Sequence, residues 1–546
     1  MIWLTGGAVA ISLVLVVGVL ALIAVRGLGH FWPAPLVHTV VQDRAGEVVI
    51  VLGEAQERET VARQVVADLG YEVGEDELLV PRHKFKLGNR DIYGNDFRWL
   101  VGAEGLMTEW EYPEDAVVLE RTEWGDFYGF PTAIIEDGET VAGLDDDASL
   151  WREMQERIER AVDLRREIDR LERSEIGANS AAQERLRLRT RRMQRTEVPA
   201  DDPAWAEIAR EQAELEEAFA EIAARRIALV EQINRDVALM RLIDDREARV
   251  PFANIVRAWR PNQMTFGDKM GHYFESFRLF IFGYPREANT EGGIFPAIFG
   301  TVIMVILMSI IVTPVGVLAA IYLREYARQG PFVRFIRICV NNLAGVPSIV
   351  FGVFGVAFFV YFVGGNIDRM FFQDAMPSPT FGTPGLFWAS LTLALLTLPV
   401  VIVSTEEGLT RIPRSIREGS LALGATKAET LWKVIVPMSA PAMMTGLILA
   451  VARAAGEVAP LMLVGVVKLA PNLPLDGNPP FLHLERQFMH LGFHIFDVGF
   501  QSPNVDAARP LVYATALVLV LIIVVLNLTA ILIRNRLREK FKSDSD

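Results

Sequence analysis

The chain has 546 residues, a formal net charge of −14 and 51% hydrophobic residues. Residues 101–150 contribute most of that charge, because they contain 14 acidic residues and one basic residue, Arg121. This acidic excess argues against nucleic acid or an anionic ligand as a partner of that segment. The single cysteine, Cys339, excludes an intramolecular disulfide and a cysteine-based metal site.

Apolar residues gather in six stretches, each long enough to cross the hydrocarbon core, which takes about 20 residues of helix. The first stretch lacks a basic region before it and a small-residue cleavage site after it, so we expect a retained anchor over 1–26 rather than a cleaved signal peptide. The chain is therefore predicted to be an α-helical integral membrane protein. Its predicted spans are 2–25, 294–323, 343–364, 386–407, 441–466 and 510–533.

The basic residues predict the orientation of these spans. Segments 324–342 and 408–440 and the C-terminal tail have more Lys and Arg than Asp and Glu, whereas segments 365–385 and 467–509 do not. An excess of Lys and Arg marks the cytoplasmic side. Both termini are therefore expected in the cytoplasm and residues 27–293 outside it, with Arg26 as a weak opposing signal.

Residues 27–147 are predicted to form an extracytoplasmic β-rich or mixed domain. "EVVIVLGE" and "DAVVLERTEW" are typical of strands, and Gly94-Asn95 and Asp137-Gly138 are typical of turns. The whole segment between the first two spans is thus expected to be an α+β domain that includes a helical hairpin.

That hairpin is predicted over residues 148–245. "VPADDPAW" looks like a loop into a helix start, with Asp202 as the N-cap and Pro203 in the first turn. A spacer or a packing surface fits the hairpin better than a catalytic role. In its second half a heptad register, interrupted by three polar residues, predicts one apolar seam formed by Trp205, Ile208, Leu215, Phe219, Ile222, Leu229, Ile233 and Met240.

Residues 246–293 are predicted to be a connector. Its segment 266–283, "FGDKMGHYFESFRLFIFG", is aromatic and partly amphipathic. An interfacial helix and a buried entry helix explain this pattern equally well.

The motif search predicts no enzyme, metal site or cofactor. No phosphate-binding G-x-x-x-x-G-K-[ST], no H-E-x-x-H and no G-x-S-x-G occurs. His490 and His494 have the i,i+4 spacing that could hold a metal, but Gly492 weakens the helix between them and no acidic residue sits at a metalloprotease position. A soluble loop with incidental histidines is the favoured interpretation.

The segment 414–441, "RSIREGSLALGATKAETLWKVIVPMSAP", is predicted to be helical, broken at Gly424, and helical again up to Pro437. It is too polar to span a membrane. A simple cytoplasmic helix-turn-helix loop and a short helix that fits a partner's groove both remain open.

The same segment resembles the EAA loop of ABC importer permeases. Glu418-Gly419-Ser420, then Gly424 and then Val434-Ile435-Val436-Pro437 follow the family spacing, with Gly419 and Ser420 in place of two alanines. "EGGIFPAIFGT", "GVPSIVFGVFG", "LTLPVVIVSTEEGL" and "VARAAGEVAPLML" together resemble the phosphate-specific permeases, and the tail "VLNLTAILIRNRLR" resembles the PstA type. The resemblance covers about 265–546, roughly half the chain.

The resemblance implies a type I ABC importer permease core over 294–546, with an EAA loop at 414–438. It also implies the bacterial inner membrane, a PstC-type permease subunit, two cytoplasmic ATP-binding subunits, an extracytoplasmic phosphate-binding protein and inorganic phosphate. A PstC-type identity or another oxyanion is the alternative. The role of the insertion 27–264 is not implied. The ATPase-docking residues would be Glu418, Gly419, Ser420, Gly424, Ala425 and Pro437.

Arg453 and Glu457 are the only charged residues from about Met443 to Val467, within the predicted fifth span. Their i,i+4 spacing predicts a pair on one helix face, beside Gly456 and Pro460, where the helix is expected to bend or unwind. Arg453 could line the translocation path and contact phosphate while Glu457 holds it in place. An ion pair that only fixes packing against the partner subunit is the open alternative.

Overall fold

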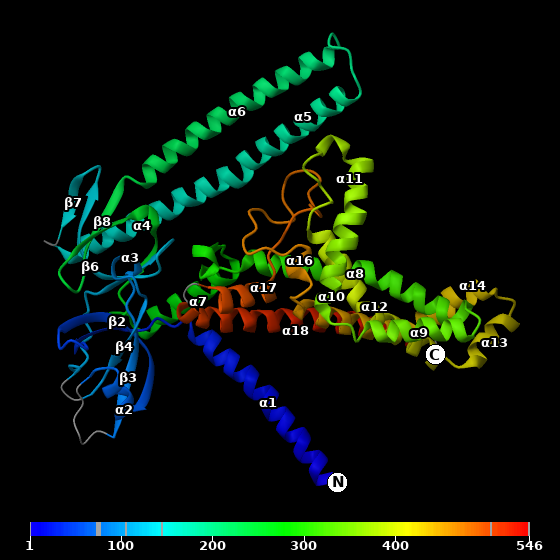
Figure 1. The fold of residues 1–546 in the computed structure, drawn as a ribbon, viewed down its shortest axis with the longest axis horizontal. Coiled ribbons are helices and arrows are strands. Elements are labelled where there is room, and N and C mark those ends of the chain that lie inside the picture. Colours follow the sequence, from blue (N-terminus) through cyan, green and yellow to red (C-terminus); the bar gives the residue numbers. More distant parts are fainter. Residues whose placement is uncertain (1, 72–77, 104–105, 144–145, 503–504, 544–546) are drawn as a thin grey trace. The chain divides into compact units, whose positions relative to one another are not determined.

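The computed structural model describes residues 2–71, 78–103, 106–143, 146–502 and 505–543. The chain divides into two compact units, whose elements are labelled in Figure 1. We call them the membrane unit (Met1–Leu28 and Ile294–Asp546) and the aqueous unit (Gly29–Gly293). The three parts predicted between the first two spans thus fold as one compact unit.

Six helical segments of the described residues are long and apolar enough to cross a membrane, which confirms the predicted number. Their bounds are Trp3–Gly29, Phe295–Tyr326, Ser348–Phe371, Leu386–Arg411, Lys427–Gly456 and Val505–Arg536. The helices that form them are α1 (Ile2–Gly29), α8 (Phe295–Ile321), α10 (Ser348–Phe354), α11 (Gly365–Phe371), α12 (Leu386–Arg411), α14 (Lys427–Thr430), α15 (Val436–Gly456) and α18 (Val505–Ser543). Shorter helices beside them are α9 (Pro331–Leu343), α13 (Arg414–Ala422), α16 (Leu461–Val464) and α17 (Leu491–Phe496).

The fifth span differs from its predicted bounds of 441–466. A capping box between Thr426 and Glu429 starts the helix at Lys427, and the helix continues through Pro437 to Gly456. A wider π-helical turn over Leu431–Ile435 ends two residues before Pro437, and π-helical turns occur mostly as single turns inside α-helices. The prediction that the helix stops at Pro437 was therefore wrong.

The aqueous unit contains two main antiparallel sheets. The first has the order β1-β2-β3-β4, and the second has the order β10-β5-β6-β8-β9 with β7 paired to β6. The strands are β1 (Leu36–Gln42), β2 (Val48–Ala62), β3 (Leu79–Lys86), β4 (Phe97–Val101), β5 (Val117–Arg121), β6 (Phe127–Glu136), β7 (Glu139–Gly143), β8 (Asp236–Arg241), β9 (Glu247–Pro251) and β10 (Ile255–Trp259). Short helices α2 (Arg63–Asp68) and α3 (Arg90–Tyr93) connect them.

The predicted turn at Asp137-Gly138 is confirmed. It joins β6 to β7, whose residues Glu136 and Glu139 face each other in register. Asp137 has φ 49° and Gly138 φ 89°, the left-handed backbone that a two-residue hairpin turn requires.

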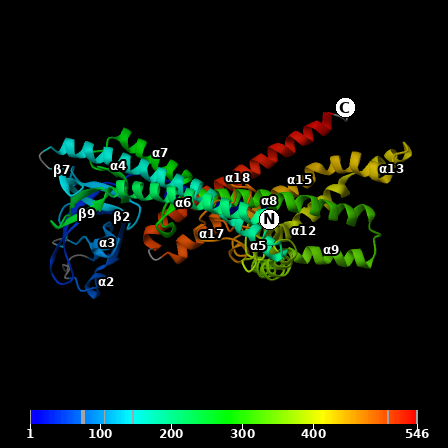
Figure 2. The same cartoon turned by 90° about the horizontal axis from the view of Figure 1, so that it is seen from above.

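The helical hairpin consists of α4 (Asp147–Arg170), continued through one π-helical turn by α5 (Gly177–Arg195), and of α6 (Pro203–Ile233). Figures 1 and 2 show the α5 and α6 arms running along each other. The predicted start of α6 is confirmed, because an Asp202 carboxylate oxygen accepts the Ala204 N–H at 2.8 Å and Pro203 occupies the first turn.

The end of the hairpin was predicted wrongly. Helix α6 ends at Ile233, and Met240 lies in strand β8, fully buried in the core of the sheet. The predicted connector likewise contributes strands β9 and β10 before helix α7 (Phe266–Phe282) begins. The hairpin is thus an insertion between β7 and β8, two strands that both pair with β6.

The core of the membrane unit is built from closely packed spans. Met304 and Met308 of α8, Leu393 of α12 and Ala450 and Ala454 of α15 are fully buried in one cluster. Small residues allow the backbones to approach, as is usual for membrane helices. The tightest backbone approach on α8 is at Gly300, where an added Cβ atom would lie 2.0 Å from the Met489 carbonyl oxygen.

Gly300→Ala is therefore expected to lower stability, because the new methyl group has no room against a backbone carbonyl. Overpacking of this kind costs about 1–3 kcal/mol. The measurement is the thermal unfolding midpoint of the purified full-length protein in nanodiscs. Gly456→Ala is the matched control, because nothing lies within 4 Å of a Cβ atom at Gly456. Equal midpoints for the two variants would contradict the packing described here.

Candidate functional site

The segment between the fourth and fifth spans folds as two helices around a sharp turn. Helix α13 ends at Ala422, and Gly424 has φ 88°, a left-handed conformation that favours glycine. Thr426 then caps the next helix, since its hydroxyl oxygen accepts the Glu429 N–H at 3.2 Å and the Glu429 carboxylate accepts the Thr426 N–H at 3.0 Å. The predicted break at Gly424 is confirmed.

The predicted docking residues lie in different settings around this turn. Glu418, Gly419 and Gly424 are exposed, Ala425 is half-buried, and the Ser420 hydroxyl lies 2.8 Å from the Thr430 hydroxyl. Pro437 is separate from the turn, within the continuous helix of the fifth span. Leu421 and Leu423, which the motif does not include, expose apolar side chains beside the turn, with Leu423 91% exposed.

This turn is bound to the end of the second span. An Arg417 guanidinium nitrogen lies 3.0 Å from a Glu325 carboxylate oxygen and also donates to the Leu409 carbonyl at 2.7 Å. The Lys427 ammonium donates to the Glu325 carbonyl at 2.6 Å. These contacts join α13 and the start of the fifth span to the ends of the second and fourth spans.

The predicted pairing of Arg453 and Glu457 is confirmed, with Arg453 Nε 3.3 Å from Glu457 Oε1. Their predicted place in mid-span was wrong. Arg453 lies in the last turn of α15, which ends at Gly456, and Glu457 is already extended, with φ −80° and ψ 134°. The fifth span runs from Lys427 to Gly456, so the pair lies at its end. Arg453 has 35% and Glu457 19% of its side chain exposed.

His490 and His494 also differ from their prediction. Both are buried, at 0% and 3% exposure, so they do not lie in a solvated loop. His490 has an extended backbone and caps α17, because its Nδ1 accepts the Gly492 N–H at 3.1 Å. His490 is thus the N-cap rather than a residue within the helix, and its carbonyl accepts the His494 N–H at 2.8 Å. Among the described residues, no group of three His, Cys, Asp or Glu side chains is placed to hold a metal.

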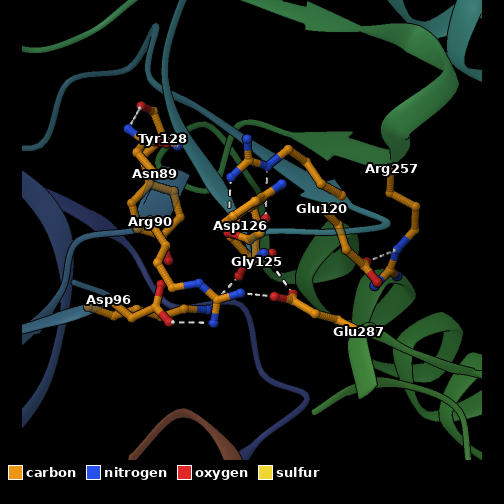
Figure 3. Close-up of polar contacts among 12 residues, drawn as sticks. Asn89, Arg90, Asp96, Glu120, Gly125, Asp126, Tyr128, Arg257 and Glu287 are labelled. Atoms are coloured by element: carbon orange, nitrogen blue, oxygen red, sulfur yellow. Dashed lines mark hydrogen bonds and ion pairs between the residues drawn. The ribbon is translucent and has the colours of Figure 1, made fainter. Parts of the chain in front are cut away.

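A second polar cluster, in the aqueous unit, was not predicted from the sequence. Figure 3 shows Arg90 between Asp96 and Glu287, with the Glu287 carboxylate also accepting the Gly125 N–H at 3.1 Å. In the same view Arg257 Nε donates to the Glu120 carboxylate at 2.7 Å. These residues come from distant parts of the chain, and no local sequence pattern connects them.

The cluster binds the short β11–β12 hairpin (Pro285–Arg286 with Glu291–Gly292) to the sheets. Arg286 of β11 pairs with Glu120 of β5. Burial alone would raise the pKa of Glu120, but the guanidinium groups of Arg257 and Arg286 lower it to about 2. This hairpin is the last structure before the second span begins at Phe295.

The pKa of Glu291 in β12 shifts in the opposite direction to that of Glu120. Burial and then repulsion from Asp126 raise its pKa from 4.5 to about 7. Between these two pH values the folded protein holds a proton that the unfolded chain releases, so this residue makes the fold less stable as pH rises.

Glu291→Gln is therefore expected to remove a loss of stability that the unsubstituted protein shows between pH 5 and pH 7.5. The measurement is the thermal midpoint of the full-length protein at both pH values. The control is Glu217→Gln, at an exposed position on α6. Burial also lowers the pKa of His272 to about 4, but this histidine is present in every variant, so its contribution cancels in the comparison. An unchanged pH dependence in Glu291→Gln would refute the role given to this carboxyl.

Comparison with known proteins gives matches to membrane transport components. The family model described as "Binding-protein-dependent transport system inner membrane component" matches residues 312–542. The phosphate transport system permease protein PstA of Mycobacterium leprae is 37% identical over 194 residues, which are 35% of this chain and 58% of that protein. This chain therefore spans little more than half the length of that relative.

The similarity to two other relatives extends over a larger share of their length. The phosphate transport system permease protein PstA 1 of Mycobacterium tuberculosis is 31% identical over 244 residues, which are 44% of this chain and 71% of that protein. The probable ABC transporter permease protein YqgI of Bacillus subtilis is 29% identical over 258 residues, which are 46% of this chain and 81% of that protein.

Proposed function

This chain belongs to the PstA-type phosphate transport permeases, and we propose that it is a membrane-spanning subunit of an ATP-driven importer of inorganic phosphate. The observation that carries the proposal is the 31% identity to PstA 1 over 71% of that protein. The six spans and the exposed turn at Gly424 support it. The fold we propose for residues 294–546 is that of a type I ABC importer permease.

The proposed assembly contains partners that supply what this chain lacks. A PstC-type permease subunit would complete the translocation path, two cytoplasmic ATP-binding subunits would hydrolyse ATP, and an extracytoplasmic phosphate-binding protein would deliver the anion. The chain itself would be non-catalytic. The excess of basic residues in alternate segments supports a place in the bacterial inner membrane with both termini in the cytoplasm and the aqueous unit outside.

Coupling would pass through the turn at Gly424. Exposed Glu418 and Gly419 and the apolar Leu423 tip would enter a groove of the ATP-binding subunit. The Arg417–Glu325 pair and the Lys427 contact would carry that subunit's motion to α8, α12 and α15. Alternating access would follow as a rigid-body movement of the spans.

Phosphate would meet Arg453 at the end of the fifth span. A dianion that leaves water needs a cation and hydrogen-bond donors in exchange, and a guanidinium offers both in a planar fork. Arg453 is partly exposed, and the helix end places it beside the unwound segment after Gly456. Glu457 would orient Arg453 and weaken anion binding enough for release. The other role that the pair could have is packing against the partner subunit.

The proposed activity is tested by uptake of radiolabelled phosphate in a bacterial strain that lacks its own phosphate permeases. Expression of this chain with its co-encoded subunits is expected to restore uptake at low phosphate concentrations. Restored uptake of another oxyanion in place of phosphate would assign a different substrate, and no uptake with a fully assembled complex would refute the proposal.

Arg453→Gln is expected to reduce phosphate uptake at least about tenfold, the equivalent of losing about 1.4 kcal/mol of interaction with the passing anion. Arg453→Lys keeps the charge and is expected to retain part of the activity. Co-purification of the partner subunits checks the assembly. Normal uptake by an assembled Arg453→Gln complex would show that the pair does not line the path.

Gly424→Val is expected to weaken binding of the ATP-binding subunit, because a β-branched residue is strained by about 1–2 kcal/mol in the left-handed conformation. Co-purified ATP-binding subunit per permease is the quantity to measure. Gly330→Val is the matched control, since Gly330 lies in another connecting segment and has an extended backbone with φ −150°. Equal loss of the ATP-binding subunit in both variants would contradict a specific role for this turn.

A further inference from the structure

Helix α7 of the aqueous unit presents two different faces. One face packs inside the unit: Phe280 is buried against Phe31, with ring centroids 5.1 Å apart, and Phe277 contacts the same ring at 5.4 Å. The ring centroid of His272 lies 4.5 Å from the ring centroid of Trp259 in β10. His272 and half of the Phe and Tyr residues of the helix thus have packing partners inside the unit.

The other face is apolar and uncovered within the aqueous unit. At about 100° per residue, the side chains of this face fall within an arc of about 160°. Three of them are strongly exposed, namely Phe266 at 73%, Phe274 at 62% and Phe282 at 67%. Arg278 is the one charged residue within the arc, and the acidic side chains of the helix lie outside it. The arc contains Phe266, Gly267, Met270, Gly271, Phe274, Phe277, Arg278, Ile281 and Phe282, of which Phe277, near one edge, contacts Phe31.

The first end of α7 lies close to the end of a span. Phe266 is in ring contact with Trp32, at 6.0 Å between centroids. Trp32 follows the first span, which ends at Gly29, by three residues. Trp32 is itself 39% exposed and extends the apolar face.

The other end of α7 lies close to the start of a span. The β11–β12 hairpin folds back on itself, so the Gly293 N–H donates to the Tyr284 carbonyl at 2.9 Å. An added Cβ atom on Gly293 would lie 2.4 Å from the carbonyl carbon of Gly283, the residue that ends α7. The second span then begins at Phe295. Both ends of α7 are thus held within a few residues of membrane-spanning helices.

We propose that α7 lies along the membrane–water interface on the extracytoplasmic side, with its apolar arc and Trp32 inserted among the lipid headgroups and upper acyl chains. A helix with both ends held at span boundaries runs parallel to the bilayer over its whole length, about 25 Å for 17 residues. Aromatic side chains favour this layer, and Arg278 in the arc reaches lipid phosphates, while the absence of an acidic group from the arc avoids repulsion. Lipid explains these features better than a protein groove does.

Spin labels test the proposal in the full-length protein. Cys339 is the only cysteine, so Cys339→Ser provides a background for single labels. Phe274→Cys and Phe266→Cys place labels in the arc. Lys269→Cys is the control, because Lys269 is half-buried, lies outside the arc and is about 140° around the helix from Phe274. Each label is measured in nanodiscs by its accessibility to oxygen, which concentrates in lipid, and to a water-soluble nickel chelate.

At Phe274 and Phe266 the ratio of oxygen to nickel accessibility is expected to exceed that at Lys269 by at least fivefold. High nickel accessibility in the arc would place α7 in water and overturn the proposal. Low accessibility to both reagents, in the complex with its partner subunits, would show a protein partner on the arc and overturn it as well. Agreement between the two arc positions guards against distortion by either label.

Discussion

Hydrocarbon accepts neither a lone charge nor an unpaired peptide group, and this constraint shapes the whole chain. It concentrates the apolar residues into six helices and confines most charged residues to the segments between them. It also explains the fifth span, where Arg453 and Glu457 pair with each other as the helix ends. A charge pair at a helix end beside unwound backbone can contact a passing anion, which a pair sealed within lipid cannot.

Polar contacts within the aqueous unit hold its first and last segments together. Its beginning and end are tied together, since the Leu36 N–H donates to the Asn262 side chain at 3.1 Å and that side chain donates back to the Leu36 carbonyl at 2.9 Å. The pair of Glu120 with Arg286 then fixes the hairpin that precedes the second span. A large insertion can therefore fold as one body while its two ends return to the membrane.

The sequence predicted what local chemistry determines. The number of spans, the Asp202 cap and the break at Gly424 each depend on a few neighbouring residues. The predictions were wrong or missing where contacts between distant segments determine the structure. Met240 continues the heptad pattern but joins a strand because β6 is there to pair with it, and the cluster around Glu120 combines residues that are far apart along the chain. The start of the fifth span was missed because its first turn, Lys427–Thr430, is polar.

The central claim is that this chain conducts phosphate through spans moved by ATP hydrolysis. The most direct test is phosphate accumulation by proteoliposomes that contain the complete complex, with ATP supplied to the ATP-binding subunits and the binding protein on the opposite side. The account predicts accumulation of labelled phosphate that requires ATP and that excess unlabelled phosphate abolishes but sulfate does not. Accumulation without ATP, or equal competition by sulfate, would contradict it.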